Sequence, residues 1–121
     1  MTQIHSRPAS TRQLDAYTVA LELARAVRPV VPDLARYERD LGSQLKRAVA
    51  SLALNIAEAQ RRTGADRAHL LTVALGSAAE VQAVLEVSAA LGAVTEAATE
   101  VPRALSDRVC AMLYRLRQRI G

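Results

Sequence analysis

Apolar residues recur at spacings of three and four along most of this chain, and that spacing places them on one face of an α-helix. Proline and glycine interrupt the pattern and divide it into four helical segments. Short connections between consecutive helices favour antiparallel neighbours. The sequence therefore predicts an all-α fold, an antiparallel up-down-up-down four-helix bundle.

The first two helices are bounded by capping and breaking signals. A loose leader, residues 1–11, precedes the first helix, and Ser10–Gln13 fits a capping box at its start. Pro29 and Pro32 end that helix at about residue 28. The second helix is predicted from Asp33, a possible N-cap, to about residue 62, with a bend or restart at residues 42–43. Its core-facing line is Leu41, Leu45, Val49, Leu52 and Ile56.

The last two helices follow in the same way. Thr63 and Asp66 form a second possible capping box, and Gly92 ends the helix that begins there. This third helix is apolar nearly all round, so we expect it to be the most buried. The last helix follows a loop around Thr95, and Pro102 is expected in its first turn, where proline is tolerated.

The composition limits what kind of core these helices can share. The 121 residues include no Phe or Trp and three Tyr, so the core must consist of Ala, Leu and Val. Such side chains suit closely packed helices. At this length, residues 1–121 are expected to form a single domain that a partner subunit would help to stabilise.

The sequence lacks the residues that several classes of function require. Cys110 is the only cysteine, and His5 and His69 are isolated, so the sequence predicts neither a disulfide, a metal site nor a cofactor. The N-terminus lacks the apolar region of a signal peptide, and no uninterrupted apolar run reaches the roughly 18 residues of a membrane span. We therefore expect a cytoplasmic protein without a membrane partner.

Positive charge is concentrated in the first half of the chain. The whole sequence has 16 Lys and Arg against 12 Asp and Glu, a net charge of +4, and the excess lies in residues 1–62. A second basic cluster ends the chain at residues 115–119. Basic patches attract phosphate backbones, although a solvated charged face is the commoner explanation. The candidate nucleic-acid-binding residues are Lys46, Arg47, Arg61 and Arg62.

A line of polar residues borders the core line of the second helix. A matching pair, Ser77 and Glu80, lies in the third helix. Glu80 is expected to be at least partly buried, and its candidate partners are Asn55, Ser77 and Arg47. This polar seam is Gln44, Ser51, Asn55, Glu58, Ser77 and Glu80. Such a set can fix the register between helices or subunits, or it can carry catalysis. We favour the structural role because no His base accompanies the two serines, so no catalytic residue is assigned.

The run from Gln44 to Leu85 resembles a known family. In this family a Gln-Leu-Arg-Arg-Ala run is followed by Ser, Asn-Ile-Ala-Glu-Gly, a Ser-capped helix with Phe-Leu, and Gly-Ser before Glu. The matching residues here are Gln44, Leu45, Arg47, Ala48, Ser51, Asn55, Ile56, Ala57, Glu58, Thr63, Gly76, Ser77 and Glu80. Ala59 and Leu70 depart from the family's Gly and Phe. The family is that of the small bacterial proteins first noted as open reading frames inside intervening sequences of 23S rRNA genes.

The resemblance implies an antiparallel four-helix bundle that assembles as a ring, commonly a homopentamer. A related branch comprises the accessory proteins of diversity-generating retroelements, which are basic pentamers that bind a reverse transcriptase and nucleic acid. We therefore expect a non-enzymatic oligomer that binds RNA or DNA through basic surfaces. The alternative is a scaffold that docks a protein partner and has no direct role with nucleic acid.

Overall fold

The computed structural model describes the backbone of residues 9–120 and the side chains of residues 15–119. Its five helices are α1 (Ala9–Val27), α2 (Val30–Tyr37), α3 (Arg39–Ala59), α4 (Gly64–Ala90) and α5 (Glu96–Ile120). The all-α prediction is confirmed for this part of the chain. Residues 9–11 of the predicted leader are helical. The side chains of the predicted capping box at residues 10–13 lie outside the described residues.

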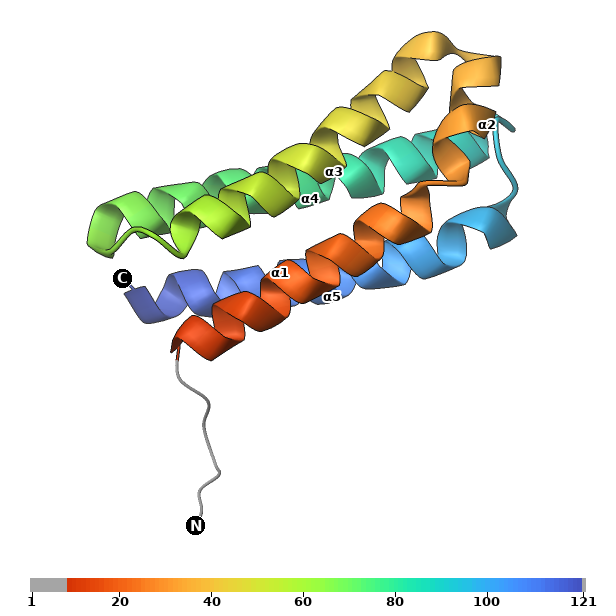
Figure 1. Cartoon of the computed structure of the whole chain (residues 1–121). Helices are drawn as coiled ribbons and strands as arrows, with labels where there is room; N and C mark the ends of the chain where they lie inside the picture. The colour runs from red at the N-terminus through yellow and green to blue at the C-terminus, as the bar shows by residue number, and fades with distance from the viewer. Residues whose placement is uncertain (1–8, 121) are drawn as a thin grey trace.

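The four long helices lie side by side in two layers, with α1 and α3 in front of α5 and α4 (Figure 1). Successive long helices run in opposite directions, and α2 lies across the end of the molecule where α4 connects to α5. The C-terminal end of α5 is next to the connection between α3 and α4. Helix α3 contacts α4 much more extensively than it contacts α1.

The core between the helices is aliphatic, as the composition predicts. Its largest fully buried side chains are Leu23, Leu34, Leu45, Leu52, Ile56, Leu71, Leu85, Leu113, Val81 and Val109. Fully buried alanines such as Ala16, Ala74 and Ala78 lie where helices pack against one another. Burying one Leu or Val side chain stabilises a fold by about 1.5–3 kcal/mol. The described core therefore needs no aromatic ring to hold the helices together.

The segment predicted as the second helix is two helices, and the break lies at Glu38. Glu38 has an extended backbone, with φ −154° and ψ 119°, between α2 and α3. Gly42, where a bend was predicted, lies inside α3 and is buried. A Cβ atom on Gly42 would lie 3.1 Å from the Cβ of Ala35 and 3.1 Å from the carbonyl oxygen of Val31. Gly42 thus permits a close approach of α2 to α3 and does not bend the helix.

The predicted start of this segment is also wrong, because α2 begins at Val30. Pro32 is the third residue of α2, in the first turn, where its missing N–H leaves no hydrogen bond unmade. Asp33 is inside the helix and pairs with Arg36 one turn later. Asp33 is therefore a first-turn carboxylate and not the N-cap.

The two ends of α4 are defined by Thr63 and Gly92. Thr63 occupies the N-cap position with an extended backbone, but its side chain makes no capping hydrogen bond. Gly92 has a φ of +81°, which glycine adopts without strain. The N–H of Gly92 donates to the carbonyl of Ala89 at 3.0 Å, and the N–H of Ala93 donates to that of Ser88 at 2.9 Å. These two bonds form a Schellman motif and confirm the predicted helix end.

Helix α5 begins earlier than the sequence suggested. Thr95 precedes it, and its Oγ1 accepts a hydrogen bond of 3.1 Å from the N–H of Ala98. This is an N-cap at the start of the helix. Pro102 is therefore in the second turn and not in the first. Since proline has no N–H, the carbonyl of Ala98 receives no hydrogen bond from the residue four places on.

Helix α4 is buried on one side only. Its inner face packs between α3 and α5. Its outer face is exposed, so the prediction that α4 is the most buried helix is wrong. Exposed residues on that outer face include Val73, Gly76, Ala79, Glu80, Ala83, Val87 and Ala90. By length and composition α4 would pass as a membrane span, since its most apolar stretch has a mean hydropathy of 1.5. Only 39% of that stretch is buried within the structure.

Candidate functional site

Three residues of the predicted polar seam meet between α3 and α4. The Ser77 hydroxyl donates to the Oγ of Ser51 at 2.8 Å. The Asn55 side-chain amide donates to the Ser51 carbonyl oxygen at 2.8 Å and to the Ser51 Oγ at 3.2 Å. Ser77 is 8% exposed, so its hydroxyl depends on this partner. The Ser77–Ser51 hydrogen bond joins α4 to α3 within one chain, whereas the Asn55 hydrogen bonds lie within α3.

The two carboxylates of the seam lie apart from these three residues. Glu58 accepts hydrogen bonds from Arg62, at 3.0 Å from Nε and 2.6 Å from Nη2, near the end of α3. Glu80 is exposed, and none of the hydrogen bonds or ion pairs found among the described residues includes it. At 100° per residue, Glu80 lies about 60° beyond Ser77 around α4, which carries it past the edge of the helix contact.

The expected partial burial of Glu80 is therefore wrong, and so is its expected contact with Ser77, Asn55 or Arg47. Gln44 is half-buried on α3 but makes none of the side-chain hydrogen bonds of the seam. It lies seven residues before Ser51, a distance of about 10 Å along the helix. The predicted seam is thus one partly buried group of three residues and three separate side chains.

The four predicted nucleic-acid-binding residues do not form one patch. All four are exposed on α3 or directly after it. Arg47 and Arg61 are 14 positions apart, which corresponds to about 21 Å along a helix. Between them α3 exposes Ala50 and Leu54, and Leu54 is 68% exposed. Lys46 and Arg47 therefore lie in the first half of α3, whereas Arg61 and Arg62 lie beyond its C-terminal end.

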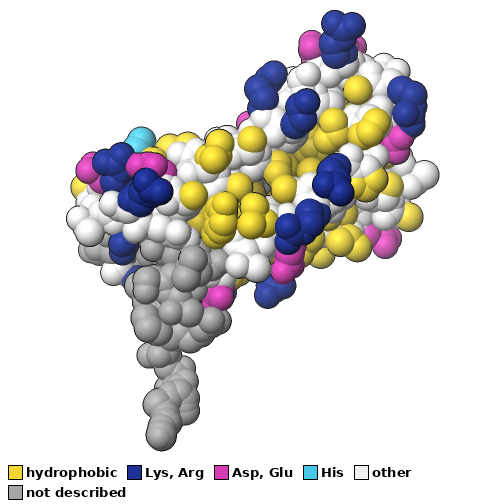
Figure 2. All heavy atoms as spheres, in the orientation of Figure 1, with side chains coloured by type: hydrophobic (Ala, Val, Ile, Leu, Met, Phe, Trp, Pro, Cys, Tyr) yellow, Lys and Arg dark blue, Asp and Glu magenta, His cyan; other side chains and the backbone are white. Residues whose placement is uncertain are grey.

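The fold brings the two basic clusters of the sequence to the end of the molecule where Arg61 and Arg62 lie. The end of α5 lies beside the connection from α3 to α4 (Figure 1), and Arg117 Nη1 donates to the Oγ1 of Thr72 on α4 at 3.4 Å. We call this group of six arginines the basic end: Arg61, Arg62, Arg67, Arg115, Arg117 and Arg119. Three acids line small pockets beside these arginines: Glu58 and Asp66 with Arg62, and Asp15 with Arg115 and Arg119. The six arginines outnumber these three acids. Figure 2 shows basic and acidic side chains side by side there.

Some arginines of the basic end are held by local contacts. Arg67 Nε donates to the carbonyl of Ala59 at 3.3 Å, which ties α4 to the end of α3. The Arg117 guanidinium lies 5.6 Å from the centre of the Tyr114 ring, within the range of a cation–π contact.

The arginines of the basic end form two separate groups in the sequence. Only the direction of the helices shows that the groups share one end.

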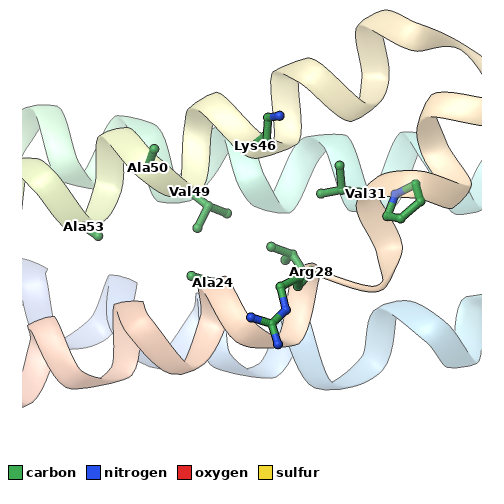
Figure 3. A pocket seen from close by; sticks show the side chains of 9 residues that line it. Ala24, Arg28, Val31, Lys46, Val49, Ala50 and Ala53 are labelled. Atoms are coloured by element: carbon green, nitrogen blue, oxygen red, sulfur yellow. The ribbon is translucent and has the colours of Figure 1, made fainter.

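A groove that sequence patterns did not reveal lies between α1, α2 and α3. Its volume is about 460 Å³, and its walls are almost entirely apolar. It is lined by Ala24, Val27, Arg28, Val31, Pro32, Lys46, Val49, Ala50 and Ala53 (Figure 3). In Figure 2, hydrophobic side chains occupy the strip between α1 and α3, with Lys and Arg side chains on both sides of it. The groove is open to solvent along this strip.

The one cysteine of the chain is not an activated thiol. Cys110 is half-buried, and burial, with a smaller effect of the Asp107 carboxylate, raises the pKa of its thiol. A thiol with a raised pKa is a weak nucleophile at neutral pH. Among the residues that the structure describes, no group of three or more His, Cys, Asp or Glu side chains could hold a metal ion.

Comparisons with known proteins agree with this architecture. A solved structure of a protein of unknown function from the S23 ribosomal protein family of Bacteroides thetaiotaomicron is similar, with a TM-score of 0.80. The two chains are 22% identical, and the similarity covers 88% of this chain and 98% of the other, which establishes the fold alone. No curated protein matches the sequence. The model of one family matches residues 12–115, so the chain belongs to the 23S rRNA-intervening sequence protein family.

Proposed function

We propose that this protein is a non-enzymatic, cytoplasmic oligomer that binds the phosphate backbone of RNA or DNA through its basic end. In this proposal the four long helices are an antiparallel four-helix bundle, and copies of the bundle form a homo-oligomeric ring. The observation that carries the proposal is the gathering of six arginines from α4, α5 and the connection between α3 and α4 at one end of the molecule.

The chemistry of the basic end favours phosphate over bases. Arginine stays charged at any physiological pH, and its planar guanidinium can donate two parallel hydrogen bonds to a phosphate. Tyr17, Tyr37 and Tyr114 are the only aromatic residues of the chain, which leaves few rings on which bases could stack. Contacts made mainly to phosphates give weak sequence specificity and a steep dependence on salt.

A ring would strengthen binding through repetition. One copy carries a modest net charge of +4, and several copies held in a fixed arrangement present several basic ends to one nucleic acid. Because the contacts are then linked, their combined affinity exceeds that of a single basic end without any new contact. Binding therefore depends on assembly as well as on charge.

The polar groups support a structural role rather than a catalytic one. The hydroxyls of Ser51 and Ser77 are hydrogen-bonded to each other, and Glu58 is occupied by Arg62. Neither serine is paired with a histidine base. We propose no reaction, no metal and no cofactor for this protein.

Filter binding tests the proposal with labelled duplex RNA and duplex DNA at increasing salt concentration. We expect retention at low salt that falls steeply as salt rises. A variant with Arg61→Glu and Arg115→Glu should bind at least about tenfold more weakly, since it removes two phosphate contacts and adds two repulsions. Arg108→Glu, on the exposed face of α5 away from the basic end, is the matched control. A wild-type protein that retains neither duplex at low salt contradicts the proposal, as does equal binding by the double variant.

The groove favours a second candidate function, a scaffold that docks a protein partner. Binding grooves are one of the places where soluble proteins expose contiguous apolar surface. Leu54, on the same helix, adds to the apolar surface that one copy leaves in water. A pure scaffold predicts that nucleic acid is not retained at any salt concentration, which separates it from the first candidate.

A further inference from the structure

The groove is a site that one copy of this chain leaves unfilled. Its facing walls are built from small side chains, with Ala24 on α1 and Ala50 and Ala53 on α3. In Figure 3, Val49 and Ala53 of α3 point toward α1, where Ala24 lies. A volume of about 460 Å³ is enough for several aliphatic side chains. An apolar gap of this size is stabilised when an apolar surface displaces its water.

Two cationic residues, Arg28 and Lys46, lie on opposite sides of the groove. Figure 3 shows Lys46 on α3 and Arg28 at the end of α1, with Ala53 toward one end of the groove and Val31 toward the other. Both cations are exposed, and neither makes an ion pair among the described residues. The groove is therefore apolar along its length, and the charged groups of Arg28 and Lys46 lie at its edges. A suitable occupant is apolar where it enters the groove and carries a negative charge that can reach these edges.

The outer face of α4 has that pattern. Val73, Glu80 and Val87 are all exposed and lie seven residues apart, so they follow one line along the helix. Gly76 and Ala83 are also exposed and lie about one helical turn before and after Glu80, beside this line, and such small residues let another helix approach closely. Less than half of the most apolar stretch of α4 is buried in one copy. Glu80 is the unpaired carboxylate at the centre of this line.

We propose that the groove of one copy receives the outer face of α4 from a second copy, with Glu80 between Arg28 and Lys46. The valines on either side of Glu80 then enter the apolar parts of the groove. This inference deepens the proposed function and rests on its oligomeric assembly. It also assigns Lys46 to the contact between copies and leaves nucleic acid to the basic end.

The contact joins two different surfaces, so it has a direction. The groove lies between α1, α2 and α3, whereas the outer face of α4 belongs to another side of the chain. Each copy therefore offers one groove and one α4 face, and each contact leaves one of each free. Head-to-tail contacts of this kind generate closed rings when the rotation between copies closes. The proposed ring follows from such a contact, and a two-fold dimer does not.

Charge reversal tests the contact by light scattering without nucleic acid. Lys46→Glu and Glu80→Lys should each weaken association at least about tenfold, because each brings like charges together. The double variant carrying both changes should regain the wild-type mass. Arg108→Glu reverses an exposed charge outside both surfaces and should leave the mass unchanged. Far-UV circular dichroism confirms that each variant remains helical.

Mixing the two single variants is the sharper test. In an equal mixture, each defective groove meets a complementary α4 face, and the remaining groove and face are both wild-type. Association should therefore return on mixing through alternating copies, although neither variant associates alone. In a ring with an odd number of copies one mismatched contact remains, so the recovered mass there is that of an open chain of copies. Single variants that assemble like the wild type overturn the proposal, and so does a loss of assembly that neither mixing nor the double variant restores.

The results separate this inference from the proposed function. Charge-dependent assembly without retention of RNA or DNA overturns nucleic-acid binding and leaves the groove contact standing. Retention of RNA together with assembly that ignores Lys46 and Glu80 overturns the groove contact alone. A monomeric wild type overturns the groove contact whatever filter binding shows.

Discussion

The two flanks of α3 differ in packing. The flank toward α4 is filled by side chains of the same copy, and the flank toward α1 borders an open groove. Toward α4, α3 presents the fully buried Leu52 and Ile56 and the hydrogen-bonded Ser51 and Asn55. Toward α1, it presents Ala50, Ala53 and Val49 across an open groove. Helix α3 accordingly contacts α4 far more extensively than α1.

The residues of the closed flank, toward α4, stabilise the fold of one copy, and those of the open flank, toward α1, are available to a second copy. On the closed flank, large side chains fill the space and buried polar groups find each other, which makes substitutions there costly. On the open flank, small side chains leave a space that the chain does not fill. Substitutions there should change association more than stability.

The largest effect is expected from Leu52→Ala on the closed flank. Leu52 is fully buried, so its truncation removes apolar contacts and leaves a cavity. We expect the free energy of unfolding to fall by about 2–5 kcal/mol. Urea denaturation followed by circular dichroism measures this. Leu54→Ala, at the 68% exposed neighbour, is the matched control and should change stability by less than about 1 kcal/mol.

Equal losses from Leu52→Ala and Leu54→Ala would contradict the assignment of the closed flank.

The next largest effect is expected from the serine pair that joins α3 to α4. Ser51→Ala removes the acceptor of Ser77 and leaves a buried hydroxyl without its partner, so stability should fall by about 1–3 kcal/mol. Adding Ser77→Ala should lower stability by less than it does alone, since the two residues interact. Denaturation of the two single variants and the double variant completes the cycle. Strictly additive losses would show that this hydrogen bond contributes nothing to the helix contact.

A smaller effect on stability is expected from Ala53→Leu on the open flank. The added side chain can enter the groove of its own copy, so the free energy of unfolding should change by less than about 1.5 kcal/mol. The same side chain blocks the groove to a second copy, so the assembled mass should fall. Light scattering and urea denaturation measure both quantities. Ala104→Leu, on exposed α5 surface, is the control that should change neither. An Ala53→Leu variant that assembles like the wild type would remove the groove from the interface.

The smallest effect is expected from Glu58→Gln, on α3 but outside both flanks. Glu58 and Arg62 are each about half exposed, so their pair should contribute about 0.3–0.5 kcal/mol. We expect a change of this size in urea denaturation at low salt and no change at high salt, where the pair is screened. A loss above about 2 kcal/mol, or a loss of assembly, would mean that Glu58 acts in a contact between copies.

The helical part of the fold follows directly from the sequence, and its details depend on packing. Apolar spacing predicted helical segments, and Gly92 marked the end of α4 correctly because its positive φ is a local property. The bend predicted at Gly42 was wrong. A glycine stands there because α3 passes close to Val31 and Ala35 of α2, which leaves no room for a side chain. No sequence pattern distinguishes such a contact from a helix bend.

The candidate site was predictable to a similar depth. Periodicity identified Ser51, Asn55 and Ser77 as residues beside the core, and the structure brings these three together. The predicted burial of Glu80 was wrong because a rotation of about 60° around α4 separates the buried position of Ser77 from the exposed position of Glu80. The groove and the basic end could not be predicted, since each combines residues that are distant in the sequence and meet only in the folded chain.

Light scattering of the wild-type protein over a range of concentrations, without nucleic acid, tests the central claim that one copy is incomplete. The account predicts a mass several times the 13.0 kDa of one chain, and a fall toward that value in Ala53→Leu. A mass of 13.0 kDa at every concentration would contradict it.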